Sequence, residues 1–142
     1  MSATATASLI SKILGPYMSQ YYQDCVAGFL ISFTLWNILN IIVFNIPLPD
    51  KNMSRNDYLD MRNRITSCIH GAIALFISGY NTYFVHSQCG EKNSEFESFI
   101  LNFSNGYFAY DFVAMAYLGI LDNSMIIHHS ICIIGLSLGL YT

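Results

Sequence analysis

Four ionisable side chains that could do chemistry lie inside otherwise apolar runs of this 142-residue sequence: His70, Asp111, His128 and His129. An aspartate near the centre of a bilayer costs about 2.5–3.5 kcal/mol on insertion scales, so such a group needs a partner or water and is a functional candidate by default. Neighbouring residues on a helix point about 100° apart. This spacing is poor for two histidines on one metal ion, but it suits a general base whose neighbour orients it or the substrate. We therefore predict no metal site.

Each of these positions also has a purely structural interpretation. His70 could be a hydrogen-bonding residue between helices, and Asp111 could bond to a tyrosine or serine of a neighbouring helix. His128 and His129 lie near one end of their apolar run, where both rings could reach lipid headgroups. The residue types alone leave both interpretations open.

The elements that must position these groups are four long apolar runs. A helix needs about 20 residues to cross about 30 Å of hydrocarbon, and these runs are too long and too evenly apolar for strands. The sequence predicts an all-α fold, a multi-span bundle of about four transmembrane helices over residues 25–142, after a non-spanning segment over residues 1–24. The polar segments 46–64 and 86–98 are predicted as loops. The expected spans are residues 25–46, 65–85, 99–121 and 125–141.

Three of the four runs carry a stripe of small and polar residues at helical spacing. Such stripes turn toward other helices rather than toward lipid, so all three are expected to face a common interior. The last stripe contains a GxxxG pattern. The stripes are Ser67, His70, Ala74, Ser78 and Asn81; Ser104, Tyr107, Asp111 and Ala114, with Tyr110 beside them; and His128, Cys132, Gly135 and Gly139.

Composition and charge agree with a membrane protein. Charged residues make up 11% of the chain, against about 25% in soluble domains. The net charge is −3, so no basic surface recommends nucleic acid as a partner. Four of the six Lys and Arg residues fall within 51–64, which places this segment in the cytosol and the N-terminus on the opposite face. The sequence allows either a disulfide between Cys25 and Cys89 or free thiols. The cysteines do not have the spacing of a zinc site.

The ordered polar residues resemble a pattern of the TLC domain family, multi-span membrane proteins that include the ceramide synthases and the translocon-associated TRAM proteins. The likeness is nearest to the small members named for the domain, and it covers about Asp57 to Thr142. The matching pieces, in chain order, are Arg62-x-Arg64-x-x-Ser67-x-x-His70, then Gly106-Tyr107-Phe108-x-Tyr110-Asp111, then Ile127-His128-His129.

The resemblance implies a lipid-handling protein of the endoplasmic reticulum or another endomembrane. In the ceramide synthases the paired histidines belong to the acyl-transfer site, so His128 and His129 are the catalytic candidates if the chain is an enzyme. Five further residues are expected to line a lipid cavity: His70, Asp111, Tyr107, Tyr110 and Ser67. Family members continue for several spans beyond the double-histidine helix. The resemblance therefore implies an incomplete chain, a diverged short form, or a piece that completes its cavity with a partner.

Three functions follow from this reasoning. The first is binding of membrane lipids in support of lipid homeostasis, without a cofactor. The second is acyl transfer from acyl-CoA, as co-substrate, to a sphingoid base, with a histidine as general base. The third is a structural subunit that docks through its polar stripes, with membrane protein partners or a second copy of itself. Binding is favoured over catalysis, because the acidic residues and second histidine that the synthases place in later spans are absent from this sequence.

Overall fold

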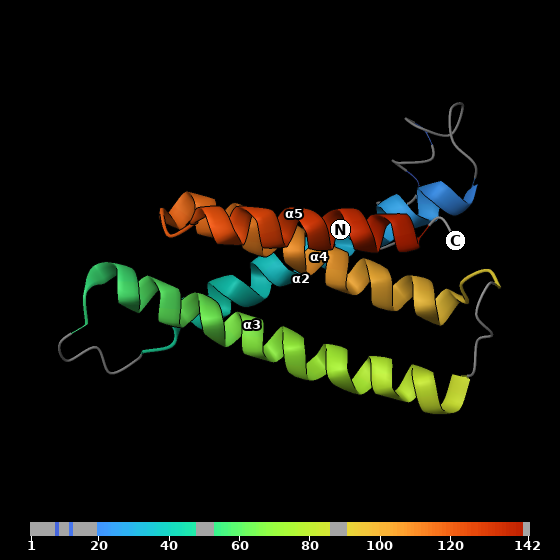
Figure 1. The fold of residues 1–142 in the computed structure, drawn as a ribbon, viewed down its shortest axis with the longest axis horizontal. Helices are drawn as coiled ribbons and strands as arrows, with labels where there is room; N and C mark the ends of the chain where they lie inside the picture. The colour runs from blue at the N-terminus through green and yellow to red at the C-terminus, as the bar shows by residue number, and fades with distance from the viewer. Residues whose placement is uncertain (1–7, 9–11, 13–19, 48–52, 86–90, 141–142) are drawn as a thin grey trace.

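The computed structural model describes residues 8, 12, 20–47, 53–85 and 91–140 (Figure 1). These residues form helices without any strand, which confirms the all-α prediction. The elements are α2 (Gln20–Asn45), α3 (Arg55–Tyr80) continued by the π-helical turn η1 (Asn81–Val85), α4 (Glu95–Leu118) and α5 (Asn123–Gly139).

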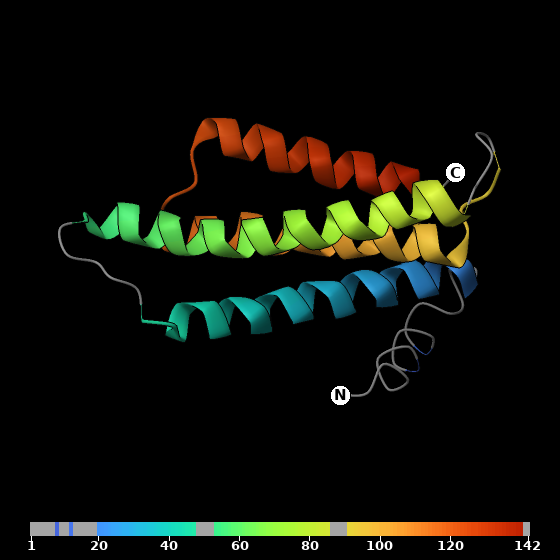
Figure 2. The ribbon, with the colours of Figure 1, turned by 90° about the horizontal axis from the view of Figure 1, so that it is seen from below.

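Helix α4 is the centre of the arrangement, because it packs against α2, α3 and α5. Figure 2 shows α2 and α5 on opposite sides of the α3–α4 pair. The closest approach is between α2 and α4, where a Cβ atom added to Gly106 would lie 2.4 Å from Ser32 Oγ. Ser32 Oγ donates to the Phe103 carbonyl oxygen at 2.8 Å, and Trp36 Nε1 donates to the same oxygen at 3.2 Å. The small residues Ser32 and Gly106 let the two helices approach closely, and side chains of α2 can then donate to this backbone carbonyl of α4.

Polar residues that the sequence analysis assigned to loops begin two of the helices. Helix α3 starts ten residues before the predicted span, because the Ser54 side chain accepts from the Asp57 N–H and caps it. Helix α4 starts at Glu95, behind a capping box formed by Ser94 and Glu97. Such caps satisfy N–H groups that the first turn of a helix leaves free. The predicted loops over 46–64 and 86–98 are therefore wrong for residues 55–64 and 95–98.

The remaining boundaries lie close to the predictions. Helix α2 begins at Gln20, five residues before the predicted span that starts at residue 25. Gly119, with φ of 73°, ends α4 in the left-handed conformation that glycine adopts without strain. Asp122 then caps α5, its Oδ1 accepting from the Met125 N–H at 2.8 Å.

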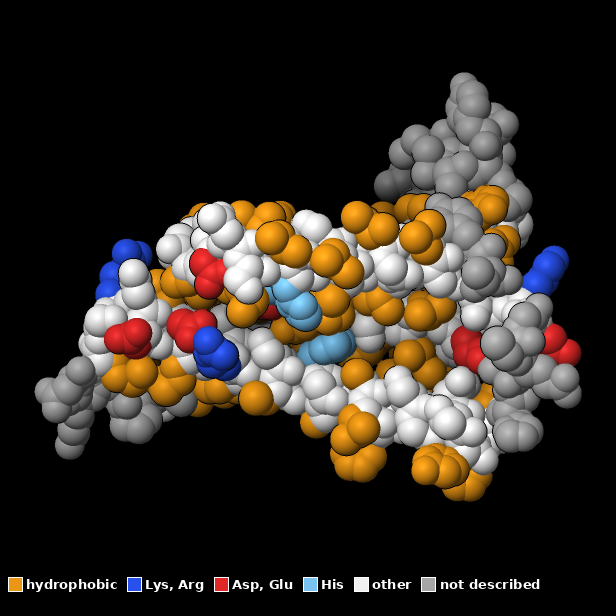
Figure 3. All heavy atoms as spheres, in the orientation of Figure 1, with side chains coloured by type: hydrophobic (Ala, Val, Ile, Leu, Met, Phe, Trp, Pro, Cys, Tyr) orange, Lys and Arg blue, Asp and Glu red, His pale blue; other side chains and the backbone are white. Residues whose placement is uncertain are grey.

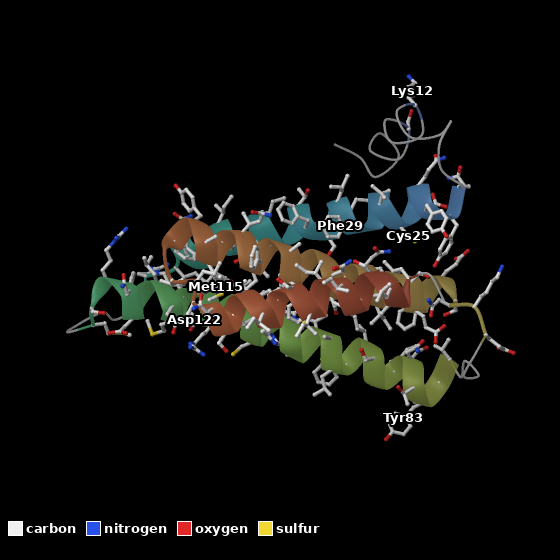
Figure 4. The ribbon with its side chains drawn as sticks, turned by 45° about the horizontal axis from the view of Figure 1, so that its top comes forward. Lys12, Cys25, Phe29, Tyr83, Met115 and Asp122 are labelled. Carbon is white, nitrogen blue, oxygen red and sulfur yellow. The ribbon has the colours of Figure 1, made fainter. Side chains whose placement is uncertain are left out.

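Polar groups are inside this bundle and apolar groups are outside. Among the described residues, eleven polar or charged side chains are buried but only seven hydrophobic ones. The aromatic core is the cluster of Trp36, Tyr107 and Tyr110. By contrast, Phe76 is 76% exposed, and Tyr83 in η1 is 82% exposed and points away from the bundle (Figure 4). This distribution is the reverse of a water-soluble domain and fits a surface that contacts lipid.

Two of the described helices are long and apolar enough to cross a membrane: α2, and α3 together with η1. Helix α5 is a shorter apolar helix. Helix α4 has 24 residues, but Glu95, Glu97 and the buried Asp111 lie in it. The membrane-spanning prediction is thus supported for two of the four expected spans.

Arg62 joins the C-terminal end of α2 to α3. It was predicted to lie in a loop, yet it is only 6% exposed. Its guanidinium group donates to the carbonyl oxygens of Val43 at 3.0 Å, Phe44 at 2.5 Å and Ile46 at 2.8 Å, and to the Tyr58 hydroxyl. The Val43 carbonyl also accepts from the Ile46 N–H at 3.2 Å. The last carbonyls of a helix lack partners within the helix, and a cation at a helix C-terminus is favourable. Arg62 therefore closes α2 and fixes it against α3.

We expect Arg62→Met to lower the free energy of unfolding by roughly 2–4 kcal/mol, because hydrogen bonds to a charged group are lost and buried carbonyls are left without donors. Trp36 is the single tryptophan of the chain, so its fluorescence during unfolding in mixed micelles measures the change. Arg64→Met is the matched control. Arg64 is largely exposed and pairs only with Asp60 one turn away, an interaction worth about 0.5 kcal/mol or less. Equal stability of the two variants would contradict the role of Arg62.

Candidate functional site

Asp111 joins three helices in the interior. Its Oδ1 accepts from Asn63 Nδ2 of α3 at 2.7 Å, and its Oδ2 lies 2.7 Å from His129 Nε2 of α5. All three residues are buried, with exposures of 5% for Asp111, 3% for Asn63 and 2% for His129. A buried carboxylate is expected to be paired in this way, because its desolvation is costly. The prediction that the polar residues of separate helices meet is confirmed for Asp111 and His129.

Both ring nitrogens of His129 are engaged. Nδ1 lies 2.8 Å from the carbonyl oxygen of Met125, one turn earlier in α5. A carbonyl oxygen only accepts hydrogen bonds, so Nδ1 must carry a hydrogen. The contact between Nε2 and Asp111 then needs one further hydrogen, which either the ring or the carboxyl group can hold. One hydrogen bond therefore joins His129 and Asp111 and orients both side chains.

A second polar group lies deeper between α3 and α4. The ring of His70 stacks on Tyr107 with centroids 3.8 Å apart and planes 7° apart, and His70 Nε2 lies 3.3 Å from Ser104 Oγ. The Tyr107 hydroxyl donates to Ser67 Oγ at 2.8 Å. Trp36 and His70 form a T-shaped contact, with ring centroids 5.4 Å apart. These contacts match the structural interpretation of His70 as a residue that bonds between helices.

A groove of about 190 Å³ lies between α3, α4 and α5. Its wall includes five residues that the sequence analysis proposed as site residues: Ser67, Tyr107, Asp111, His128 and His129. Figure 3 shows histidine side chains at the surface between α3 and α5, with acidic and basic side chains on the same face. Two predicted lining residues are not part of this wall. His70 is buried under Tyr107, and Tyr110 is 1% exposed in the aromatic core.

His128 and His129 have different environments. His128 is exposed, and its ring meets the edges of Phe108 and His129 at 5.7 Å and 5.3 Å between centroids. Both of its nitrogens lie 3.9 Å from Cys132 Sγ, which is a weak contact. Of the two rings, that of His128 is the accessible one, because His129 is 2% exposed and both of its nitrogens are engaged. A proton transfer there would use His128 as the acid or base, while His129 would act only through its neighbours.

The stripe predicted for α5 does not face the interior of the bundle. It grouped His128 and Cys132 with the two glycines of the GxxxG pattern, yet the buried residue is His129. A Cβ atom added to Gly135 would have no heavy atom within 4 Å, and one added to Gly139 would lie 3.6 Å from Leu101. The glycine pair therefore forms no close helix contact within the described part of the chain. In the stripe predicted over α3, Ser78 is exposed, whereas Asn81 at its end donates through Nδ2 to Glu97 of α4 at 3.4 Å.

Asn63 is a site residue that the sequence analysis missed. It was assigned to the loop before the second span, although it lies four residues before Ser67 and seven before His70. This spacing extends the predicted stripe by one turn and could have revealed both the residue and the longer helix. The sequence left open whether Cys25 is a free thiol or is bonded to Cys89. Cys25 is a free thiol, and Cys89 lies outside the described residues. Within residues 20–47, 53–85 and 91–140, no group of three or more His, Cys, Asp or Glu side chains is placed to hold a metal ion.

Comparisons with protein-family models, with curated proteins and with solved structures found no match to this chain. The resemblance to the TLC domain family thus stays a prediction from the sequence pattern, and the site has to be interpreted from its own geometry.

Proposed function

We propose that this chain is a multi-span membrane protein of TLC type that binds a membrane lipid and contributes to lipid homeostasis. In this proposal all four helices cross the bilayer of the endoplasmic reticulum or a related endomembrane. The N-terminus faces away from the cytosol, and the groove between α3, α4 and α5 holds the lipid headgroup.

The observation that carries the proposal is the meeting of ionisable side chains from separate helices at one groove. The groove wall combines the exposed ring of His128 with Asp60 and Arg64, and the Asp111–His129 pair forms its floor. A cavity that offers both donors and acceptors suits a polar headgroup better than an acyl chain.

The position of the groove along the helices supports the same function. Asp60 and Arg64 lie in the N-terminal part of α3, and the neighbouring end of α5 begins at Asn123, next to the exposed Asp122. Charged residues mark the headgroup level of a bilayer, because they are costly further inside. The basic residues within 51–64 assign this level to the cytosolic leaflet. A lipid could then keep its chains in the bilayer while its headgroup enters the groove.

We expect His128→Trp to reduce the lipid that copurifies with the protein several-fold, because an indole ring at this position fills the groove. The measurement is mass spectrometry of lipids extracted from equal amounts of purified protein. Ile127→Trp is the matched control, since Ile127 is 61% exposed and does not line the groove. The substitution is neighbouring, introduces the same ring and is not expected to alter the bound lipid.

Equal lipid content in the two variants would contradict binding in this groove. It would favour the alternative in which the polar residues only join helices of a larger membrane assembly. An unfolded His128→Trp variant is recognised separately, because the Ile127→Trp variant and the wild-type chain provide the reference for yield and for thermal unfolding.

A further inference from the structure

A second pocket lies between α2 and α5, with α4 as its floor. Its volume is about 230 Å³. Tyr22, Cys25 and Phe29 form the α2 wall, and Figure 4 shows Cys25 and Phe29 on the side of α2 that faces the other helices. Apolar side chains of α5 form the opposite wall. None of the pocket-lining residues belongs to the groove between α3, α4 and α5.

Two asparagines of α4 form the floor of this pocket. Asn102 and Asn105 lie one turn apart, and their exposures are 7% and 4%. The Nδ2 group of Asn105 donates to Ser137 Oγ at 3.0 Å. The Oδ1 atoms of both asparagines are buried, and neither has a hydrogen-bond partner within the described part of the chain. Buried side-chain oxygens are rarely left without a donor, so two of them at one pocket need an explanation.

The surrounding residues hold these amides in place. A Cβ atom added to Gly28 of α2 would lie 3.0 Å from Asn102 Nδ2, so the missing side chain of Gly28 leaves room for the Asn102 amide. The bond to Ser137 fixes the Asn105 amide plane. The Asn105 amide is therefore held in position before any ligand arrives, and because both Oδ1 atoms are buried, a donor reaches them once the side chains that cover them shift.

We propose that this pocket binds a neutral single-chain lipid that carries a hydroxyl group or an amide N–H next to its chain. The donor of the ligand would bond to the free Oδ1 atoms of Asn102 and Asn105. Among the described residues, no charged side chain lines the pocket, so an ionised headgroup would lack a partner there. Ligand pockets usually measure about 300–1,000 Å³. The smaller volume here accepts the polar group and the first part of a chain, and the rest of the chain extends into the bilayer.

The free thiol of Cys25 in the pocket wall provides a direct test with the wild-type chain. Monodecanoylglycerol is the donor-bearing probe, and its di-O-methyl ether has the same chain but no O–H group. The rate of modification by methyl methanethiosulfonate is measured at each cysteine by mass spectrometry. We expect the glycerol probe to slow modification at Cys25 by about fivefold or more once it exceeds its Kd, because only the unoccupied fraction reacts. The ether should protect Cys25 much less, and neither should protect Cys68, which is exposed on α3.

Asn105→Leu is expected to remove the preference for the glycerol probe, because leucine keeps a similar volume but offers no acceptor. Asn40→Leu is the matched control, since the Oδ1 atom of Asn40 is also buried without a described partner but lies outside this pocket. Equal protection by the two probes in the wild-type chain, or no protection by either, would overturn the proposal. A preference that survives in Asn105→Leu would also overturn it. The wild-type comparison decides the question even if Asn105→Leu does not fold, and the result does not depend on the groove at His128.

Discussion

Replacing Gly106 by alanine should destabilise the bundle by about 3 kcal/mol, near the upper end of the usual cost of overpacking a core. The new Cβ atom would lie 2.4 Å from Ser32 Oγ, 2.5 Å from Ser32 Cβ and 2.7 Å from the backbone nitrogen of Phe33. Backbone cannot rotate away as a flexible side chain can, so α2 and α4 would have to separate. That separation would also stretch the hydrogen bonds from Ser32 and Trp36 to the Phe103 carbonyl. Unfolding followed by Trp36 fluorescence measures the loss.

Gly135→Ala is the control for the change from glycine to alanine. The added methyl group would meet open space, and alanine in a helix is favoured over glycine by roughly 0.5–1 kcal/mol. A second variant, Ser32→Gly with Gly106→Ala, removes two of the three close contacts and should be more stable than the sum of the single changes. If Gly106→Ala were as stable as the wild-type chain, α2 and α4 would not approach as closely as the structure places them.

The second large effect is expected at Asp111. We expect Asp111→Leu to lower the free energy of unfolding by roughly 3–5 kcal/mol, because removing one partner leaves the buried His129 ring and the Asn63 amide without their bonds. Asp111→Asn should cost only about 1 kcal/mol, since an amide can still accept from Asn63 through its oxygen and donate to a neutral His129 ring through its nitrogen. Denaturant unfolding in mixed micelles compares the two variants.

Asp60→Leu is the matched carboxylate control. Asp60 lines the same groove, but its side chain is 39% exposed and pairs only with Arg64. Its replacement is expected to change stability by about 0.5 kcal/mol or less. If Asp111→Leu cost no more than Asp60→Leu, Asp111 would not be the buried junction of three helices.

The number and order of the helices between residues 20 and 140 that the structure describes could be predicted from the sequence, because long apolar runs separated by polar segments have few alternatives to helices. The helix ends could not be predicted from hydropathy. Residues 55–64 are polar, and they are helical because Ser54 caps them and because Arg62 finds acceptors at the end of α2. That stabilisation comes from a different helix, and a search for apolar runs along the chain does not detect it.

The sequence was sufficient to predict which helices contribute to the site. The predicted residues that line one groove are Ser67, Tyr107, Asp111, His128 and His129. The choice between the two histidines was not predictable. Adjacent residues point about 100° apart, and the direction of the inner one depends on the rotation of α5 about its axis. The GxxxG pattern suggested the face of His128, but Asp111 of α4 pairs with His129 and sets the rotation. Asn102 and Asn105 carried no signal either, because an unpaired amide oxygen is a property of the packed structure.

The unequal hydropathy of the helices has a consequence for biogenesis. Helix α4 contains four polar side chains that are buried in the bundle: Asn102, Ser104, Asn105 and Asp111. Transfer of this helix by itself from the insertion machinery into lipid would therefore have little favourable free energy. Helices α2 and α3 precede α4 during synthesis and are apolar enough to insert on their own. Arg62 of α3 bonds to the end of α2 and so holds the two helices together. We expect this hairpin to be in place first and to receive α4 as a docking partner. The emergence of α5 would then bring His129 to Asp111.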